Sequence, residues 1–459
     1  MRRIAALLLA VASLSAEPLR VDDVLSSVEA KYPPYLMALI EQDLAAGRLR
    51  RASGAFDLGF VARGGFNPRS YYDGSSGEVQ LEQALPFWGA DVFAGYRVSS
   101  GLLADYDKMR TQEDGELRAG LRFSLLRDGP VDRRRAELWK ARFEKEAADP
   151  FVQRQRLDVL RAAARSYYQW VSAGLRLGVA EELHRVALER DTGLRKQADK
   201  GMLAPIVVVD NERLVISRQL GVVQARRRFE AASLELSLFN RSADDAPVVP
   251  GRDRLPSAFP APVAPAPSDE KGLADAASAR RPELARIELL RQRTDVDRRL
   301  ADNDTLPNLD VTLGVTRNLG SGPYADRRPD EASVGVELRV PVQRNEARGR
   351  LQVAEAEIRR LERDASFTRD RIVNEVRDGL SALRAASEQI SQTTRNVELA
   401  DRLAEAERRR FEQGATDLLA LQIREQAAFD ARQADLEARA DFFRAMADYR
   451  AALGETTGY

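Results

Sequence analysis

A seven-residue repeat of apolar residues is the feature that most limits how this chain can fold. The repeat runs through two registers, the first being Leu351, Ile358, Ala365 and Ile372 and the second Val376, Leu383, Ile390, Val397, Ala404 and Phe411. No proline interrupts the segment from Arg348 to Phe411. A sustained seven-residue period is typical of a left-handed coiled coil. We therefore predict one long helix over residues 344–412, about 100 Å in length at 1.5 Å per residue.

A glycine ends this helix, and the same plan recurs in the first half of the chain. Gln413 and Gly414 break the repeat, and the sequence predicts a return helix over 416–453. In the first half we predict a long helix over 130–200, a break at Lys200 and Gly201, and a return helix over 205–240.

The two breaks belong to an internal duplication. RRFEQGATDLLALQIREQ and RKQADKGMLAPIVVVDNERL place Gly414 and Gly201 at the same point, and Glu425 and Glu212 the same distance beyond. Only two copies are present, so this is a duplication and not a solenoid. The predicted divisions are a first repeat over 17–243, a proline-rich linker over 244–270 and a second repeat over 271–455.

Each repeat also contains segments that alternate strictly between apolar and polar residues. LDVTLGVT and SVGVELRVPV in the second half, and LRAGLRFSLL in the first, are typical of strands with one apolar face. The predicted strands are about 55–66, 117–126, 309–317 and 333–342. Each strand pair is preceded by a helix, the first over 21–52 with an interruption at Pro33 and Pro34, the second over 272–302.

The first half carries an insertion with no counterpart in the second. Residues 77–101 contain two more alternating runs, which predict an extra hairpin or an elaborate loop. Its surroundings are rich in aromatic residues of the kind that form the interface girdles of membrane strands. These aromatic residues are Tyr71, Tyr72, Phe87, Trp88, Phe93 and Tyr96.

The N-terminus predicts export. Residues 1–16 have the order of a secretory signal peptide, with two arginines, an apolar run and small residues, and cleavage after Ser15 or Ala16. No later window of about 18 apolar residues could form a membrane-spanning helix. If the protein enters a membrane, strands must carry it.

Composition argues against enzymatic chemistry and nucleic-acid binding. The chain has no cysteine and a single histidine, His184, so thiol chemistry is excluded and no histidine cluster exists for a metal or a triad. Lys+Arg and Asp+Glu both total 71, which leaves no net basic field for nucleic acid. The arginine runs 133–135 and 408–410 are interpreted as positioning or adaptor contacts. We predict no enzyme activity and no cofactor.

Four strands are too few to close a membrane barrel, since the smallest such barrels have about eight. Three chains would supply twelve main strands. Polar strand faces would line water and valine and leucine faces would meet lipid. The helix pairs of three chains would form a hollow helical cylinder around the same axis. The predicted fold is thus mainly α with membrane β, a trimeric twelve-strand β-barrel on an α-helical barrel.

The chain resembles the TolC family of outer-membrane efflux proteins over about residues 20–455. The resemblance rests on RPELARIELLRQ, LPNLDVTLGV, VGVELRVPV, RGRLQVAEAEIRRLERD and RFEQGATDLLALQ, in this order and spacing. It implies a homotrimer in the lipid of the cell outer membrane with a long periplasmic extension. Such a trimer is the passive exit duct of a tripartite efflux or type I secretion system, joined to an inner-membrane pump by a periplasmic adaptor (membrane fusion) protein.

The family's adaptor contacts and gate lie at the helix–turn–helix tips. Carried onto this sequence, the tip residues are Lys200, Gly201, Met202, Gln413, Gly414, Ala415 and Thr416. Family members often carry an aspartate nine residues after the second tip glycine, where this chain has Ile423. Asp210 occupies the equivalent place in the first half, and Asp417 lies nearer the second turn, so both are candidate gate or lumen residues.

Two other classes of function are alternatives to the duct. A coiled-coil structural protein of the cell envelope explains the seven-residue repeat but leaves the two-faced strands without a purpose. A hydrolase on a helical stalk lacks any compact cluster of catalytic side chains. The sequence selects none of drug, metal, polysaccharide or protein as the cargo of a duct.

Overall fold

A computed structural model describes residues 17–69, 71, 73–103, 110–263, 269–322, 324 and 327–458. The predicted signal peptide, Tyr72 and part of the proline-rich linker lie outside these ranges. The chain divides into two compact units. The helical unit comprises the chain up to Leu39, Val152–Pro282 and Arg369 onward, and the sheet unit comprises Ile40–Phe151 and Glu283–Thr368.

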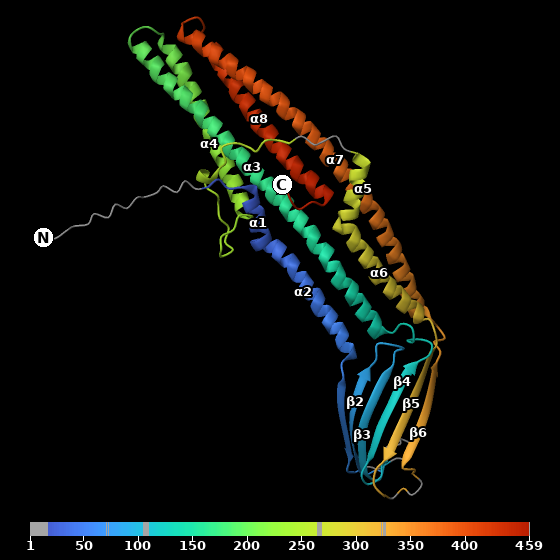
Figure 1. Ribbon diagram of the computed structural model, residues 1–459. Coiled ribbons are helices and arrows are strands. Elements are labelled where there is room, and N and C mark those ends of the chain that lie inside the picture. Colours follow the sequence, from blue (N-terminus) through green and yellow to red (C-terminus); the bar gives the residue numbers. More distant parts are fainter. Residues whose placement is uncertain are drawn as a thin grey trace, which may run out of the picture. The chain divides into compact units, whose positions relative to one another are not determined.

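Helices make up most of the chain (Figure 1). They are α1 (Val21–Lys31), α2 (Pro33–Ser53), α3 (Arg133–Asp199), α4 (Pro205–Ser237), α5 (Glu270–Arg280), α6 (Pro282–Asn303), α7 (Asn345–Glu412) and α8 (Leu418–Leu453), with 3-10 turns η1 (Gly54–Phe56) and η2 (Arg252–Arg254). The long helices and their return helices lie within three residues of the predicted bounds at each end. Among the described residues, no helix is both long and apolar enough to span a membrane.

Prolines set the breaks between the shorter helices. Tyr32 has an extended backbone (φ −78°, ψ 114°) before Pro33, which gives the interruption predicted there. The prediction of a single helix over 272–302 was wrong. Arg281 is extended in the same way before Pro282, so the segment forms two helices, α5 and α6. The Arg281 side chain is buried and donates to the carbonyls of Ala451 and Ala452, both at 3.2 Å. The break therefore ties the end of α5 to the end of α8.

In the helical unit, two antiparallel hairpins, α3 with α4 and α7 with α8, share one core (Figure 1). Its largest fully buried side chains include Trp170 and Phe442, and the Trp170 indole donates to the Ser233 hydroxyl at 3.1 Å. The rings of Tyr168 and Phe443 stack with centroids 4.5 Å apart. Burial raises the pKa of Tyr168 to about 12, because the phenol is held away from water, which would solvate its charged form.

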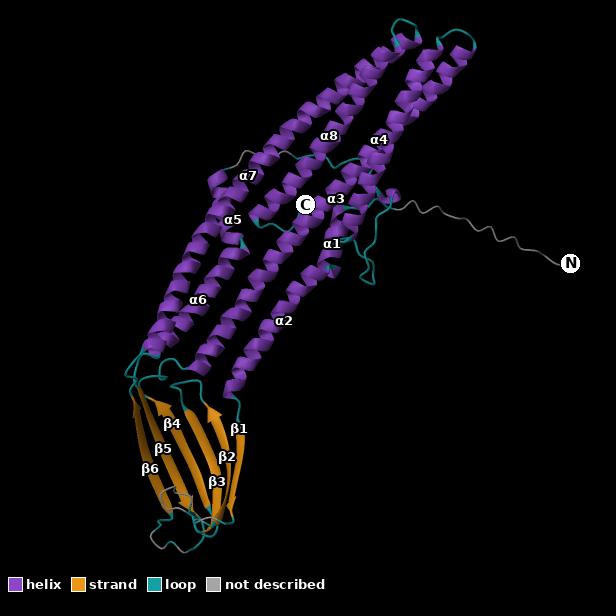
Figure 2. Cartoon of the chain, turned by 180° about the vertical axis from the view of Figure 1, so that it is seen from behind, coloured by secondary structure: helices purple, strands orange, loops and turns teal. Residues whose placement is uncertain are grey.

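The sheet unit contains one antiparallel sheet in chain order (Figure 2). Its strands are β1 (Gly59–Asn67), β2 (Gly74–Ala84), β3 (Asp91–Gly101), β4 (Glu116–Ser124), β5 (Asn308–Asn318) and β6 (Asp330–Arg339). The first repeat thus contributes β1 to β4 and the second contributes β5 and β6.

Of the two forms predicted for the insertion, the hairpin is the one present: β2 and β3 lie inside the sheet, so the four predicted main strands become six. The first strand also begins later than predicted, since Phe56 belongs to the turn η1. The last strand ends at Arg339 and not at Val342, in keeping with the inability of Pro341 to donate a ladder hydrogen bond. Of the predicted aromatic girdle, Phe87 and Trp88 lie exposed in the turn between β2 and β3.

Strand pairing sorts the side chains of the sheet into two faces. Because partners in a ladder share a face, Phe123, Val311 and Val336 lie on one side, and Arg122, Thr312 and Gly335 on the other. Traced across all strands, the apolar face includes Phe60, Val79, Val92, Leu121, Leu313 and Val334. The polar face includes Arg63, Glu78, Arg97, Glu116, Asp310 and Glu337.

One position on the polar face requires glycine. Phe93 on β3 is paired with Gly120 on β4, and its ring lies over the place where a side chain of residue 120 would start. A Cβ at Gly120 would also lie 2.6 Å from the Leu313 carbonyl oxygen. By contrast, the nearest atom to a Cβ at Gly335 is the Cβ of Thr312, at 3.8 Å.

We predict that Gly120→Ala destabilises the protein and that Gly335→Ala does not. Overpacking against a ring and a backbone oxygen costs roughly 1–3 kcal/mol, whereas Gly335 has room for a methyl group. Thermal unfolding of the detergent-solubilised variants, followed by circular dichroism, measures the difference. Equal midpoints for the two variants would contradict the packing described for Phe93.

Candidate functional site

The turns that end the two helix hairpins are built identically. We call Lys200–Leu203 tip 1 and Gln413–Thr416 tip 2. Gly201 and Gly414 both have φ of +72°, the left-handed region that favours glycine. In each tip the glycine amide donates to the carbonyl three residues back, at 2.9 and 3.0 Å, and the next amide to the carbonyl five residues back, at 3.0 and 2.8 Å. The duplication read from the sequence therefore extends to single hydrogen bonds.

Both tips are exposed. Lys200, Gly201, Gln413, Gly414 and Ala415 are all exposed, and Thr416 is half-buried. Large apolar side chains at and next to the tips are also exposed, namely Met202, Ile206, Leu419 and Ile423. The tips thus offer a mixed polar and apolar surface.

The two candidate aspartates have local partners. Asp210 on α4 forms an ion pair with Arg213, Oδ1 to Nη2 at 3.3 Å, and is half-buried. Asp417 is exposed and caps α8, its Oδ1 accepting from the Ala420 amide at 2.8 Å. Asp417 therefore stabilises the start of the return helix, whatever else it contacts.

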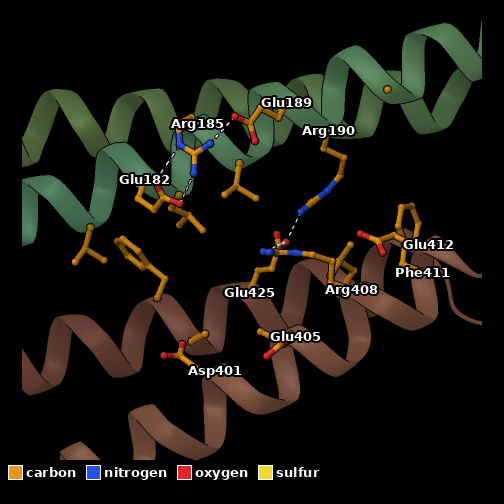
Figure 3. Close-up of a pocket in the computed structure, with 18 of the residues that line it drawn as sticks. Glu182, Arg185, Glu189, Arg190, Asp401, Glu405, Arg408, Phe411, Glu412 and Glu425 are labelled. Atoms are coloured by element: carbon orange, nitrogen blue, oxygen red, sulfur yellow. Dashed lines mark hydrogen bonds and ion pairs between the residues drawn. The ribbon is translucent and has the colours of Figure 1, made fainter.

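A buried charge cluster lies further along the hairpins, and sequence reasoning did not identify it (Figure 3). Glu425 on α8 is 4% exposed and contacts arginines from three other helices. Arg190 on α3 donates to its Oε1, Arg408 on α7 approaches the same oxygen at 3.3 Å, and Arg218 on α4 lies 3.8 Å from Oε2. One carboxylate thus links all four helices of the two hairpins, and we call these four residues the Glu425 cluster.

The Glu425 cluster carries more positive than negative charge. Arg190 and Arg218 are nearly buried, with side chains 9% and 4% exposed. Burial lowers the pKa of Arg218, and the nearby Glu425 partly opposes this shift. Glu425 is therefore the counter-ion on which two buried arginines depend.

The duplication explains how the cluster is built. Arg195 and Glu212 occupy the places in the first repeat that Arg408 and Glu425 occupy in the second, and their side chains also approach each other, at 3.7 Å. Both Arg195 and Glu212 are half exposed. The positions that correspond to Arg190 and Arg218 hold Leu403 and Ala431. The pair within a hairpin is thus common to both repeats, and only the pair of the second repeat has buried partners.

A cavity of about 680 Å³ lies beside the cluster, between α3 and the hairpin of α7 and α8 (Figure 3). Its walls alternate acidic and basic side chains, including an ion-paired triplet in which Arg185 contacts Glu182 and Glu189 at 2.6 and 2.5 Å. Phe411 and Phe429 supply apolar surface. Among the described residues, no group of histidine and acidic side chains is arranged to hold a metal ion.

The polar face of the sheet carries a second network of charges. Successive strands place Arg63, Glu78, Arg97 and Glu116 in one row, alternating in sign. Glu116 is 2% exposed and accepts from Arg97 at 2.6 Å and from Arg327, in the loop between β5 and β6, at 3.3 Å. This row joins the hairpin β2–β3 to its neighbours by charge as well as by backbone hydrogen bonds.

The arginines at the junction of β4 and α3 position the strand against the helix. Arg134 contacts both carboxylate oxygens of Asp91, at 2.7 and 3.2 Å. Arg135 is buried and donates to the Gly129 carbonyl at 2.6 Å. The positioning role inferred for residues 133–135 agrees with these contacts, and Arg408 likewise has an internal role in the Glu425 cluster.

Comparison with known proteins relates this architecture to a known family. Residues 273–455 match the family model described as outer membrane efflux protein. Residues 273–455 are an outer membrane efflux protein domain. No curated protein matches the sequence significantly.

Solved structures extend the likeness to the whole fold. VceC of Vibrio cholerae is 16% identical with a TM-score of 0.67, the alignment covering 95% of this chain and 96% of that one. The CmeC channel of Campylobacter jejuni (13%, TM-score 0.70, 95% and 85% covered) and the MtrE channel of Neisseria gonorrhoeae (14%, 0.68, 95% and 89%) are similar as well. At these identities the likeness shows the fold, helices with an antiparallel sheet as in outer-membrane efflux channels.

The resemblance to outer-membrane efflux proteins predicted from sequence is thereby confirmed. The predicted localisation also agrees, since the efflux family and these structures are named for the outer membrane. The Glu425 cluster could have been suspected from one signal only: Glu425 and Arg408 repeat as Glu212 and Arg195. Nothing in the sequence shows that Arg190 and Arg218 both contact Glu425 and not its counterpart Glu212.

We predict that Glu425→Gln destabilises the helical unit and that Glu212→Gln, its counterpart in the other repeat, has no measurable effect. The first change keeps the side-chain shape but leaves two buried arginines without a counter-ion, and breaking a buried pair in this way costs roughly 3–5 kcal/mol. Urea unfolding monitored by tryptophan fluorescence tests this, because Trp170 lies in the core of the same unit. Similar urea midpoints for both variants would contradict the role of Glu425.

Proposed function

We propose that this protein is an outer-membrane channel that acts as the passive exit duct of a tripartite efflux or type I secretion system. The observation that carries the proposal is the two-faced sheet attached to the efflux-channel fold. A sheet that is apolar on one face and charged on the other suits a wall between lipid and water.

The apolar face is suited to lipid. Val334, Val336 and Leu338 on β6 are 73%, 67% and 62% exposed, and Phe60 and Phe66 on β1 are similarly bare. A soluble protein rarely leaves so many large apolar side chains together in water. The opposite face, with Arg63, Glu78 and Glu337, is suited to line an aqueous lumen.

Homotrimerisation accounts for the surfaces left open in one chain. The strands β1 and β6 have a partner on one side only, within the described residues. An exposed apolar stripe at three- and four-residue spacing also runs along α4, made of Ile206, Val209, Ile216, Leu220 and Val223. Such a stripe suits helix packing against another hairpin. Closure into a ring of three copies would cover both features.

The tips are the proposed docking site for a periplasmic adaptor, through which an inner-membrane pump would deliver cargo. Both tips are exposed, and Met202, Ile206 and Leu419 provide apolar contacts next to polar Lys200 and Gln413. Asp210 and Asp417 remain the candidate gate or lumen residues. A coiled-coil structural protein of the envelope, the alternative function, would have no use for the charged and apolar faces of the sheet.

We predict that the protein fractionates with the outer membrane and leaves it only with detergent, as an oligomer of about three 51.0 kDa chains. The physical reason is that the apolar face and the open strand edges are stable only in lipid and against neighbouring copies. Membrane fractionation followed by light scattering of the detergent-solubilised protein measures both properties. Recovery as a water-soluble monomer would overturn the channel.

A further inference from the structure

The hairpin β2–β3 is inserted between strands that would otherwise be neighbours. It pairs with β1 over all nine residues of that strand and with β4 over seven residues. Consequently β1 and β4 do not touch, and the sheet of one chain is continuous only through the hairpin.

The side chains of the hairpin fit a wall on both faces. On the apolar face, Val79, Ala94 and Tyr96 continue the rows of β1 and β4, and the polar Ser75 and Gln83 lie near the two ends of β2. On the polar face, Phe93 packs over Gly120, and the Arg118 guanidinium of β4 reaches Glu78 of β2 at 3.0 Å. These contacts cross strand boundaries, so removing the hairpin from the sheet would break packing and ion pairs together.

The two free edges are complementary. In an all-antiparallel sheet of six strands, β1 and β6 run in opposite directions, so the β6 edge of one copy can pair antiparallel with the β1 edge of the next. Phe60 and Phe66 of β1 lie on the same face as Val334 and Val336 of β6, so a joined wall keeps its apolar side continuous. On the polar side, the exposed Arg63 would meet a strand that carries Glu331 and Glu337.

We propose that the hairpin is a permanent part of the membrane wall, so that three copies close a ring of eighteen strands instead of twelve, by pairing β6 of each copy with β1 of the next. This inference rests on the proposed function, from which it takes the membrane location and the three copies. The count follows from six strands in each of three chains.

The extra strands change the width of the duct in the membrane. At a strand spacing of about 4.8 Å and a tilt of about 40°, twelve strands give a wall about 24 Å across and eighteen strands one about 36 Å across, backbone to backbone. Barrels of 16–18 strands leave an open aqueous channel. The insertion therefore widens the outer opening by about one half relative to a wall of four strands per chain.

Cysteine pairs test the arrangement directly, because the natural chain has no cysteine. Ala94→Cys with Ala119→Cys places thiols on register partners of β3 and β4, whose Cα atoms in such a ladder are about 4.5–5.5 Å apart, within disulfide range. In the membrane-embedded trimer this pair should form a disulfide within one chain. A protease site placed in the β3–β4 loop detects it, because after cleavage the disulfide keeps the two fragments together on a non-reducing gel. Ala94→Cys with Ala332→Cys is the matched control and should not react, because Ala332 lies on the same face but on β6, three strands away from β3.

A second set of cysteines tests the seam between copies. Val336→Cys on β6 is combined in turn with cysteine at Phe60, Ala62, Gly64 or Phe66 on β1. At least one combination should yield covalent dimers and trimers. Cysteines at Val61 and Arg63, on the opposite face of the same strand, are the matched controls and should give none. Absence of cross-links at all four positions would overturn pairing of β6 with β1.

Deletion of residues 74–101 tests the width. The deletion removes both strands of the hairpin and leaves β1 and β4 joined at the same end of the sheet. In planar bilayers, poly(ethylene glycol) molecules that enter the full-length pore from its outer side should be excluded from the deletion variant, whose wall is narrower by about one third. Equal size limits for the two proteins would overturn the inference, and if the variant does not fold, the cysteine pairs still decide.

The outcomes separate this inference from the proposed function. A soluble or monomeric protein contradicts the channel itself. A membrane-embedded trimer in which Ala94→Cys and Ala119→Cys fail to form the disulfide retains the channel and rejects the eighteen-strand wall.

Discussion

The fold of the sheet unit depends on the parity of strand pairing. Since side chains alternate across a strand, a slip of one residue at any of the five pairings would send a charged row into the apolar face. Several contacts make such a slip costly here: Phe93 fits over Gly120, and the row Arg63, Glu78, Arg97 and Glu116 alternates in sign only in the observed register. The two-faced wall, and with it the proposed channel, follows from this fixed register.

The helical unit shows what a duplication keeps and what it changes. Gly201 and Gly414 form identical caps, because a chain that reverses direction between two helices needs a left-handed residue wherever it occurs. Glu212 and Glu425 have diverged, because only the second copy faces Arg190 and Arg218 across the hairpins. Local backbone geometry is thus conserved between repeats, while long-range charge pairing is specific to one of them.

This contrast explains how much the sequence could predict. The spacing of apolar residues and the glycines and prolines that end helices are local signals. The helices, their tips, the apolar and polar strand faces and the family resemblance could therefore all be predicted from the sequence. The structure differs from these predictions where a competing local signal or a distant partner decides the outcome. Pro282 breaks the helix predicted over 272–302, and Phe56 forms a turn although it alternates like a strand residue. The Glu425 cluster draws on four helices, and no spacing along the chain encodes that convergence.

The strand count could also have been anticipated from a topological rule. An insertion between β1 and β4 must add an even number of strands, since an odd number would reverse β4 and lead α3 out of the opposite end of the sheet. A hairpin is the smallest insertion that satisfies this rule, and it leaves the directions of both edge strands unchanged. Two alternating runs around Phe87 and Trp88 therefore had to enter the sheet together or remain outside it together. The faces of these two runs match those of β1 and β4, so pairing of their backbone hydrogen bonds favours their entry into the sheet. The two repeats therefore differ in their number of strands, while their helices are equivalent.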